Sequence, residues 1–360
     1  MRTYLDWNAT TPLRPEVKAA ITEALEISGN PSSVHTEGRA AKMALERARE
    51  QVSIALGAEG ADVVFTSGTT EAAAMILASK NIRCAEVEHS AIKVWCDASL
   101  PVDRNGIVAV DDPAMTTLQL ANSETGVIQN LPQGLASSDL TQAFGKMPFA
   151  FNWLGVTAGF VSAHKLGGPK GIGALVLKKG TDVPSLLRGG GQEQGRRAGT
   201  ENMIGILAFA AAAQAAQRDL ENGVWEQVAA RRDLLEARLC DIAPGAVIAG
   251  KGARRLPNTT CLLTSGWKGE TQVMQMDLAG FAISAGSACS SGKVRASGTL
   301  QAMGYDDQLA QSAIRISISP SLGDDQINRF ADAWEKAYSR WHGRNGVTGL
   351  VGQGPTTKEG

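Results

Sequence analysis

Residues 62–78 read DVVFTSGTTEAAAMILA. The run at 62–65 is short and apolar, as in a buried strand, and residues 72–78 are apolar in the manner of a helix. Gly68 stands in the turn between them. A strand, a glycine turn and a helix form the repeating unit of α/β proteins, so this stretch predicts an α/β fold.

The same alternation continues along the chain. Apolar runs separated by loops and helical patterns indicate further strands at 117–121, 159–162 and 173–177. Periodic apolar residues with start and stop signals predict helices at 15–25, 36–56, 203–217 and 225–240. This order is typical of a wound, mostly parallel central sheet.

A smaller C-terminal α/β domain is expected after Pro244-Gly245. Its predicted strands lie at 259–263, 283–285 and 314–318, and its predicted helices at 270–278 and 324–338. We therefore expect a large domain over 14–245 and a small domain made of 1–13 and 246–345. The tail at 346–360 has no apolar pattern and is expected to be disordered.

Composition favours a small-molecule enzyme. The 360 residues are 43% hydrophobic, which is enough for a large core, and the formal net charge is −1. Neither nucleic acid nor an anionic membrane is therefore expected as a partner. The start of the chain has no secretion-signal pattern, and no run approaches the ~18 apolar residues of a membrane-spanning helix. A cytoplasmic protein is expected.

The turn at 67–70 has two interpretations. The hydroxyls of Thr69 and Thr70, the backbone N–H groups around Gly68 and the helix dipole would favour a phosphate. An ordinary helix cap made by the same serine and threonines also explains the pattern. The turn alone leaves both interpretations open.

Lys165 lies in a glycine-rich loop between two predicted strands, within SAHK at 162–165. A lysine becomes an imine-forming nucleophile when its surroundings lower its pKa, and Ser162 and His164 could hold the phosphate of a cofactor. The alternative is a solvated loop lysine.

Asp139 and Gln142 lie three residues apart near a predicted strand end, where a carboxylate and an amide could converge on one ring. A pyridinium nitrogen needs such a carboxylate. His89, which follows another strand-like segment, could stack on the same ring. Taken one at a time, each of these residues is equally compatible with a structural role in a loop.

The five cysteines have neither CxxC spacing nor a histidine cluster, so no disulfide framework and no metal site is predicted. Cys84, Cys96, Cys240 and Cys261 lie in apolar surroundings and are expected to be small core residues. Cys289 lies among glycine, serine and alanine at 284–292, which indicates an accessible, mobile thiol.

Several motifs in register resemble the NifS/IscS-like cysteine desulfurases of the class V aminotransferase family. They are YLDWNATTP at 4–12, GNPSSVH at 29–35, SAHK at 162–165 with GPKG at 168–171, GGGQEQGRRAGTEN at 189–202 and GSAC at 286–289. The resemblance covers roughly residues 4–335 and departs from the family pattern at Trp7, at Ala72-Ala73 and at Gln194. It implies a fold-type I transferase that depends on pyridoxal 5'-phosphate and forms a homodimer.

The resemblance also implies a role for each matching residue. The catalytic residues would be Lys165, which forms the imine with the cofactor, Cys289, which receives sulfur, and His89, which stacks on the ring. The other expected cofactor ligands are Asp139, Gln142, Gly68, Thr69, Thr70, Ser162, His164 and, toward the partner subunit's cofactor, Thr200. The expected substrate ligands are Asn8, Asn122 and Arg315.

The implied reaction converts L-cysteine to L-alanine and leaves the sulfur on Cys289 as a persulfide, for iron-sulfur cluster assembly or another sulfur-transfer pathway. A sulfur-acceptor or iron-sulfur scaffold protein is the expected partner, and the sequence leaves its identity open. A selenocysteine lyase or small-amino-acid aminotransferase would share Lys165, Asp139 and Arg315 but would not need Cys289. A non-catalytic sulfur-relay or scaffold protein would be expected to lack Lys165 or Asp139, and both are present.

Overall fold

The computed structural model describes residues 2–78, 80–286 and 296–346. Its strands are β1 Thr3–Tyr4, β2 Asp62–Thr66, β3 Arg83–Ala85, β4 Asp97–Leu100, β5 Leu135–Asp139, β6 Val156–Ser162, β7 Gly173–Leu177, β8 Val247–Ile248, β9 Thr259–Leu263, β10 Phe281–Ala282, β11 Ser284–Ala285 and β12 Ile314–Ser317. Its α-helices are α1 Pro15–Ala24, α2 Thr36–Ala55, α3 Thr69–Leu77, α4 Ser90–Lys93, α5 Met203–Glu221, α6 Val224–Ile242, α7 Gly269–Leu278, α8 Gly298–Ala302, α9 Asp307–Gln311 and α10 Asp324–Gly346.

The central sheet has the strand order β2-β7-β6-β5. β5 and β6 run parallel, whereas β7 runs antiparallel to both of its neighbours. Parallel bridges from Thr117 to Ser137 and from Thr116 to Arg83 extend the sheet toward the parallel pair of β3 and β4. The prediction of a mostly parallel sheet is therefore confirmed, with β7 as the exception.

The predicted strand at 117–121 forms bridges rather than a continuous ladder. On one side the N–H groups of Leu118 and Leu120 donate to the carbonyls of Ser137 and Asp139 on β5. On the other side lies β3, which is only three residues long and pairs at the beginning of the segment alone. The segment is thus extended, but one of its edges has a short partner.

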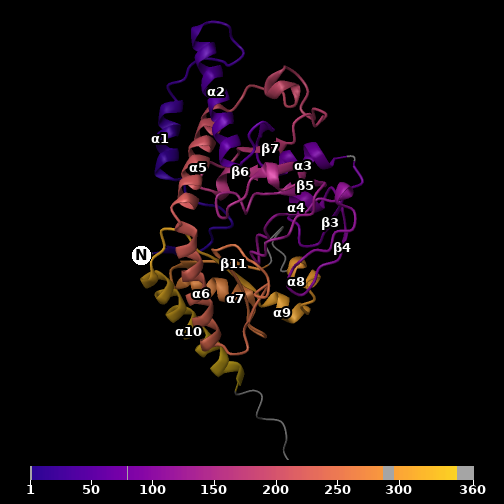
Figure 1. Ribbon diagram of the computed structural model, residues 1–360. Helices are drawn as coiled ribbons and strands as arrows, with labels where there is room; N and C mark the ends of the chain where they lie inside the picture. Colours follow the sequence, from indigo (N-terminus) through magenta and orange to yellow (C-terminus); the bar gives the residue numbers. More distant parts are fainter. Residues whose placement is uncertain (1, 79, 287–295, 347–360) are drawn as a thin grey trace, which may run out of the picture.

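Both faces of the central sheet are buried. Val63 and Phe65 of β2 pack in one apolar cluster with α2 and α5, while Val64 packs in another with α3. Alternating strand residues point to opposite faces, so a strand covered on both sides must be apolar throughout. Figure 1 shows α1, α2 and α5 together on one side of the sheet, and α3 on the other.

A second sheet, with the strand order β11-β12-β9-β8, is antiparallel throughout. Its core includes residues of α6, α7 and α10 and lies below the central sheet in Figure 1. The start of the chain joins this part, because Thr3 pairs with Phe281 and Leu5 is buried in the same cluster. The division of the chain into domains at 14–245 and 246–345 remains a prediction.

The core of the central part centres on Phe209 of α5, which is fully buried and makes edge-to-face contacts with Phe65 and Phe144. We expect Phe209→Ala to lower the free energy of unfolding by about 3–5 kcal/mol, because it removes apolar contacts and leaves a cavity. Urea unfolding measures the loss.

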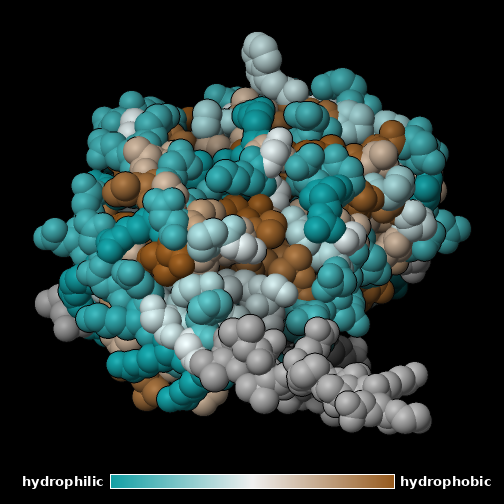
Figure 2. Space-filling view, turned by 90° about the horizontal axis from the view of Figure 1, so that it is seen from below, coloured by the Kyte–Doolittle hydropathy of each residue, from teal (hydrophilic) through white to brown (hydrophobic). Residues whose placement is uncertain are grey.

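Figure 2 shows the lower end of the molecule as mainly hydrophilic around a central group of apolar residues.

Leu278→Ala is the control for the Phe209→Ala substitution, since Leu278 of α7 is 87% exposed. A change within about 0.5 kcal/mol is expected for the control. Equal losses for the two variants would contradict this account of the core.

Candidate active site

Five of the predicted site residues follow parallel segments of the central sheet at one edge. Because parallel strands end at the same edge of a sheet, residues far apart in sequence meet there. They are Gly68 after β2, His89 after β3, Asn122 after the segment 116–120, Asp139 at the end of β5 and Lys165 after β6.

Lys165 is held at this edge by a short 3-10 turn over Ala163–Lys165. Its Nζ donates to the carbonyl oxygens of Asn8 at 2.7 Å and Ala9 at 2.8 Å. Burial, reinforced by the Arg315 guanidinium, lowers the pKa of Lys165 to about 8, against the opposing effect of nearby carboxylates. Lys165 is therefore a half-buried amine held by two backbone carbonyls, and not a solvated loop lysine.

The turn before α3 fits a phosphate. Its N-terminal cap is Gly68, which makes no side-chain capping hydrogen bond, so the first N–H groups of the helix are not capped by a side chain. A Cβ placed on Gly68 would lie 3.5 Å from the Ser162 hydroxyl oxygen, so the turn after β2 comes close to the end of β6 although β7 lies between the two strands. Thr69 hydrogen-bonds Thr141 at 2.6 Å, and Thr70 is exposed in the first turn of α3.

His164 points to the N-terminal segment. Its Nδ1 lies 3.1 Å from the Thr10 hydroxyl, and burial, with the neighbouring lysines, lowers the pKa of the imidazole to about 4. The ring is therefore neutral at physiological pH, and as a phosphate ligand it would act as a hydrogen-bonding group rather than a cation.

Asp139 and His89 supply the groups that a pyridinium ring requires. Asp139 is 9% exposed, and its Oδ1 accepts the N–H of Thr141 at 2.9 Å. His89 is the N-cap of α4, where its Nδ1 accepts the N–H of Ala91 at 3.2 Å. Burial lowers the pKa of His89, while the Asp139 carboxylate acts in the opposite direction. An imidazole of lowered pKa and a buried carboxylate thus lie close enough to influence each other.

Gln142 is buried beside them. Its Nε2 donates to the Asn8 carbonyl oxygen at 3.0 Å, and its Oε1 accepts from Nζ of Lys146 at 2.6 Å. The amide therefore has one N–H that neither of these contacts uses.

The predicted substrate residues differ in how much of each side chain is engaged within the protein. Arg315 on β12 donates to Asp6 at 2.7 Å and to the Ser123 carbonyl at 3.3 Å, while its buried Nε has no partner among the described residues. Asn122 donates to the Val87 carbonyl at 2.9 Å, and its Oδ1 accepts three hydrogen bonds from its own turn. Arg315 thus retains donor capacity for a carboxylate, whereas the Asn122 oxygen is already used.

The side chain of Asn8 is fully engaged. Its Oδ1 accepts from Lys146 and Asn258, and its Nδ2 donates to Thr259 and to the Ser123 carbonyl. At 1% exposure, Asn8 joins the two sheets rather than presenting its amide to a ligand.

Thr200 lies apart from this cluster. Thr200 is exposed between the turn Gln192–Gly195 and α5, in a segment that the Arg197–Glu71 ion pair of 2.9 Å ties to α3. Cys289 lies outside the described residues. Among the other cysteines, Cys84 and Cys261 are buried, in agreement with the expected core role, and Cys96 and Cys240 are half-buried.

Asp6 and Lys146 belong to the site but carry no local signal that identifies them. Asp6 pairs with Arg315, although 309 residues separate them. Lys146 is 1% exposed and lies between Asn8 and Gln142. The sequence places this lysine one turn after Gln142, and that spacing is its only sign of a shared role.

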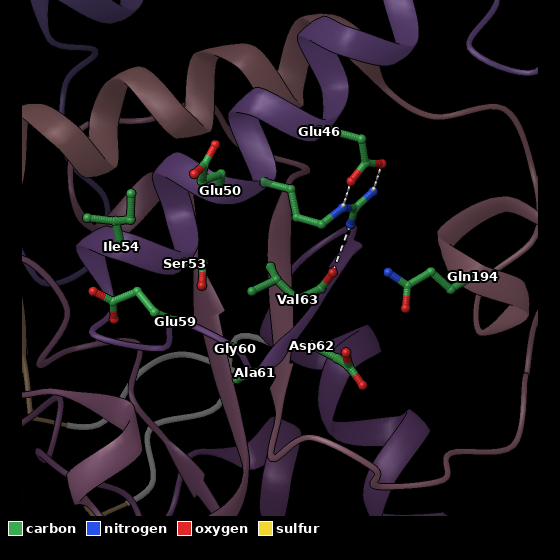
Figure 3. A pocket seen from close by; sticks show the side chains of 11 residues that line it. Glu46, Glu50, Ser53, Ile54, Glu59, Gly60, Ala61, Asp62, Val63 and Gln194 are labelled. Atoms are coloured by element: carbon green, nitrogen blue, oxygen red, sulfur yellow. Dashed lines mark hydrogen bonds and ion pairs between the residues drawn. The ribbon is translucent and has the colours of Figure 1, made fainter.

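The cavity in Figure 3, of about 340 Å³, lies elsewhere. It is lined by Asp62, the first residue of β2, and therefore opens at the opposite end of this strand from Gly68.

In the described part of the chain, no group of three acidic, histidine or cysteine side chains is placed to hold a metal ion. Within the same residues, no helix has the length and apolarity needed to cross a membrane.

Comparison with known proteins decides the family. The family model described as aminotransferase class-V matches residues 3–330. The chain belongs to the class V aminotransferases. This family depends on pyridoxal phosphate, which confirms the cofactor prediction, and the fold-type I architecture is confirmed as well.

The curated relatives are similar over nearly their whole length. The chain is 35% identical to the cysteine desulfurase IscS of Dictyoglomus turgidum, over 92% of this chain and 93% of that protein. It is also 35% identical to the cysteine desulfurase NifS of Azotobacter vinelandii, over 91% of this chain and 90% of the relative.

Solved structures agree with these relatives. A NifS-like protein matches with a TM-score of 0.83 and 30% identity, over 94% of this chain and 100% of that one. The NifS-like protein of Rickettsia africae matches with a TM-score of 0.85, 28% identity and the same coverage. The predicted resemblance to NifS/IscS-like desulfurases is confirmed.

The lowered pKa of Lys165 predicts early reactivity toward an amine-directed reagent. After the cofactor is removed, we expect modification of Lys165 to rise with a midpoint near pH 8, because only the neutral amine is nucleophilic. Peptide mass spectrometry across a pH series measures this midpoint, with the exposed lysines of the same sample as the control. A midpoint near 10.5, the ordinary value for lysine, would contradict the burial and charge argument.

Proposed function

We propose that this protein is a cysteine desulfurase that converts L-cysteine to L-alanine and transfers the sulfur to Cys289 as a persulfide. The observation that carries the proposal is the half-buried Lys165 amine, placed at one sheet edge with Asp139 and His89, with a pKa lowered by burial and by the positive charge of Arg315. These are a nucleophilic amine, a carboxylate for a pyridinium, a neutral ring for stacking and a cation for a substrate carboxylate.

The residues present fit pyridoxal phosphate. The helix end at Gly68–Thr70 and the Ser162 and His164 side chains would hold its phosphate, and the Asp139 carboxylate would face its ring nitrogen. When bound, the cofactor supplies an electron sink for the charge left by the removed α-proton.

The chain's own groups carry the remaining steps. Arg315 would grip the substrate carboxylate, for which its unpartnered Nε supplies a further donor. The Lys165 amine, whose pKa is lowered to about 8, would serve as the base that removes the α-proton of the substrate. Asp6, which holds the Arg315 guanidinium, would position this grip.

Sulfur transfer from the substrate to Cys289 needs no outside oxidant. The Cys289 thiolate attacks the substrate sulfur, so that a sulfur–sulfur bond forms as the carbon–sulfur bond breaks. The electron pair of the broken bond stays with carbon, which takes up a proton and becomes the methyl group of alanine. A reductant would then release the persulfide sulfur as sulfide.

A homodimer and a protein sulfur acceptor complete the proposal. The exposed position of Thr200 suits a contact with the partner subunit's phosphate. The acceptor would be an iron-sulfur scaffold or another sulfur-transfer protein. The cytoplasmic location expected from the sequence remains a prediction.

Two substitutions separate cofactor binding from sulfur transfer. We expect Lys165→Ala to abolish the visible absorbance of the bound cofactor, because the covalent link is lost. We expect Cys289→Ser to keep this absorbance and to release no sulfide from L-cysteine. Absorbance spectra and a sulfide assay on the purified variants measure both outcomes.

The alternatives predict different results. A selenocysteine lyase or small-amino-acid aminotransferase would keep its activity in Cys289→Ser. Cofactor absorbance that survives Lys165→Ala would contradict the assignment of the lysine.

A further inference from the structure

Lys146 is a buried amine that the proposed chemistry does not use. It follows β5 in the turn that contains Gln142, and its side chain is 1% exposed. Lysine is almost never buried to this degree without an acidic partner. The ion pairs found among the described residues do not include Lys146, so no carboxylate in direct contact favours the charged form of its amine.

The hydrogen bonds of Lys146 go to two neutral amides. Nζ donates to Oδ1 of Asn8 at 2.9 Å and to Oε1 of Gln142 at 2.6 Å. Burial lowers the pKa of Lys146 well below its usual value, and the positive charges of Lys165 and Arg315 act in the same direction. An amine in this costly position indicates a specific task.

These contacts determine which way the Gln142 amide faces. Its oxygen meets the amine of Lys146, and its Nε2 meets the carbonyl oxygen of Asn8 at 3.0 Å. In the flipped orientation two oxygens would face each other at Asn8, and the Lys146 amine would lose the Gln142 oxygen as its acceptor. The second N–H of Nε2 is left as the group that Gln142 can offer to a ligand.

The same amine also acts on Lys165. Asn8 accepts from Lys146 through its side chain and from Lys165 and Gln142 through its backbone carbonyl. Fixing the Asn8 side chain therefore also fixes the Asn8 carbonyl oxygen, to which the Lys165 amine donates a hydrogen bond.

We propose that Lys146 is a positioning residue that holds Gln142 as an N–H donor toward the ring hydroxyl of the cofactor and fixes the Asn8 carbonyl beside Lys165. The inference rests on the proposed function, because it takes the ring hydroxyl as the ligand of Gln142. It assigns to Lys146 a role that it exerts through Asn8 and Gln142.

The pH titration of the cofactor's visible absorbance tests this role. A donor to the ring oxygen favours the form in which the lysine–cofactor link has lost its proton, since that form leaves the most negative charge on the oxygen. We expect Lys146→Met and Gln142→Met each to raise the titration midpoint by about one pH unit, and the double variant to raise it no further than Gln142→Met alone.

The control is Gln272→Met, which removes a buried amide that donates to the carbonyls of Trp267 and Ser312 within the second core. It is expected to lower thermal stability and to leave the midpoint unchanged. If Lys146→Met does not fold, Lys146→Arg replaces it. A midpoint equal to that of the wild type would then support the donor role, and one equal to that of Gln142→Met would contradict it.

Two results would overturn the inference. One is a wild-type midpoint in Lys146→Met; the other is a shift that persists in full when Gln142 is already replaced, which would make Lys146 a distant charge rather than a positioning residue. Wild-type protein that binds no cofactor would instead overturn the proposed function, and the inference with it, so the two failures are distinguishable.

Discussion

The buried Asn8 connects the two sheets to the reactive lysine, and the candidate site depends on it. Its side-chain amide forms hydrogen bonds with Thr259 on the second sheet and with Lys146 beside the central sheet. Its backbone N–H donates to the Ser317 hydroxyl at 2.9 Å. Its carbonyl accepts from Lys165. Because unpaired amide groups are costly in the interior, this residue fixes how the N-terminal segment lies across the strand ends. Arg315 on the second sheet thereby comes near enough to Lys165 for its charge to lower the pKa of the amine.

The arrangement of charge at this edge explains why Lys165 is reactive. Lys146 is buried and Lys165 is half-buried, and the positive charge of Arg315 acts on both amines. Burial disfavours a charged amine, and nearby cations disfavour it further, so both pKa values fall. The carboxylates of Asp139 and Asp6 oppose this effect only partly for Lys165. A neutral amine is thus available at moderate pH, as bond formation to a carbonyl compound requires.

The sequence predicts features that depend on local residue patterns. It does not predict contacts between residues that are far apart in the chain. The stretch 62–78 forms β2 and α3 because an apolar run and a glycine turn are local signals. Asp139 was predicted at a strand end and ends β5. By contrast, the partnership of Lys146 with Asn8 spans 138 residues, and only the folded sheet creates it. The antiparallel direction of β7 and the interrupted segment at 117–121 depend in the same way on which strands become neighbours.

One sample tests the central claim directly. Purified protein is mixed with L-cysteine and a reductant, and alanine and sulfide are quantified while the visible spectrum is recorded. The account predicts a coloured protein that releases alanine and sulfide in equal amounts, because one carbon–sulfur bond yields one of each. Coloured protein that releases neither product from L-cysteine would contradict the desulfurase assignment and favour an aminotransferase.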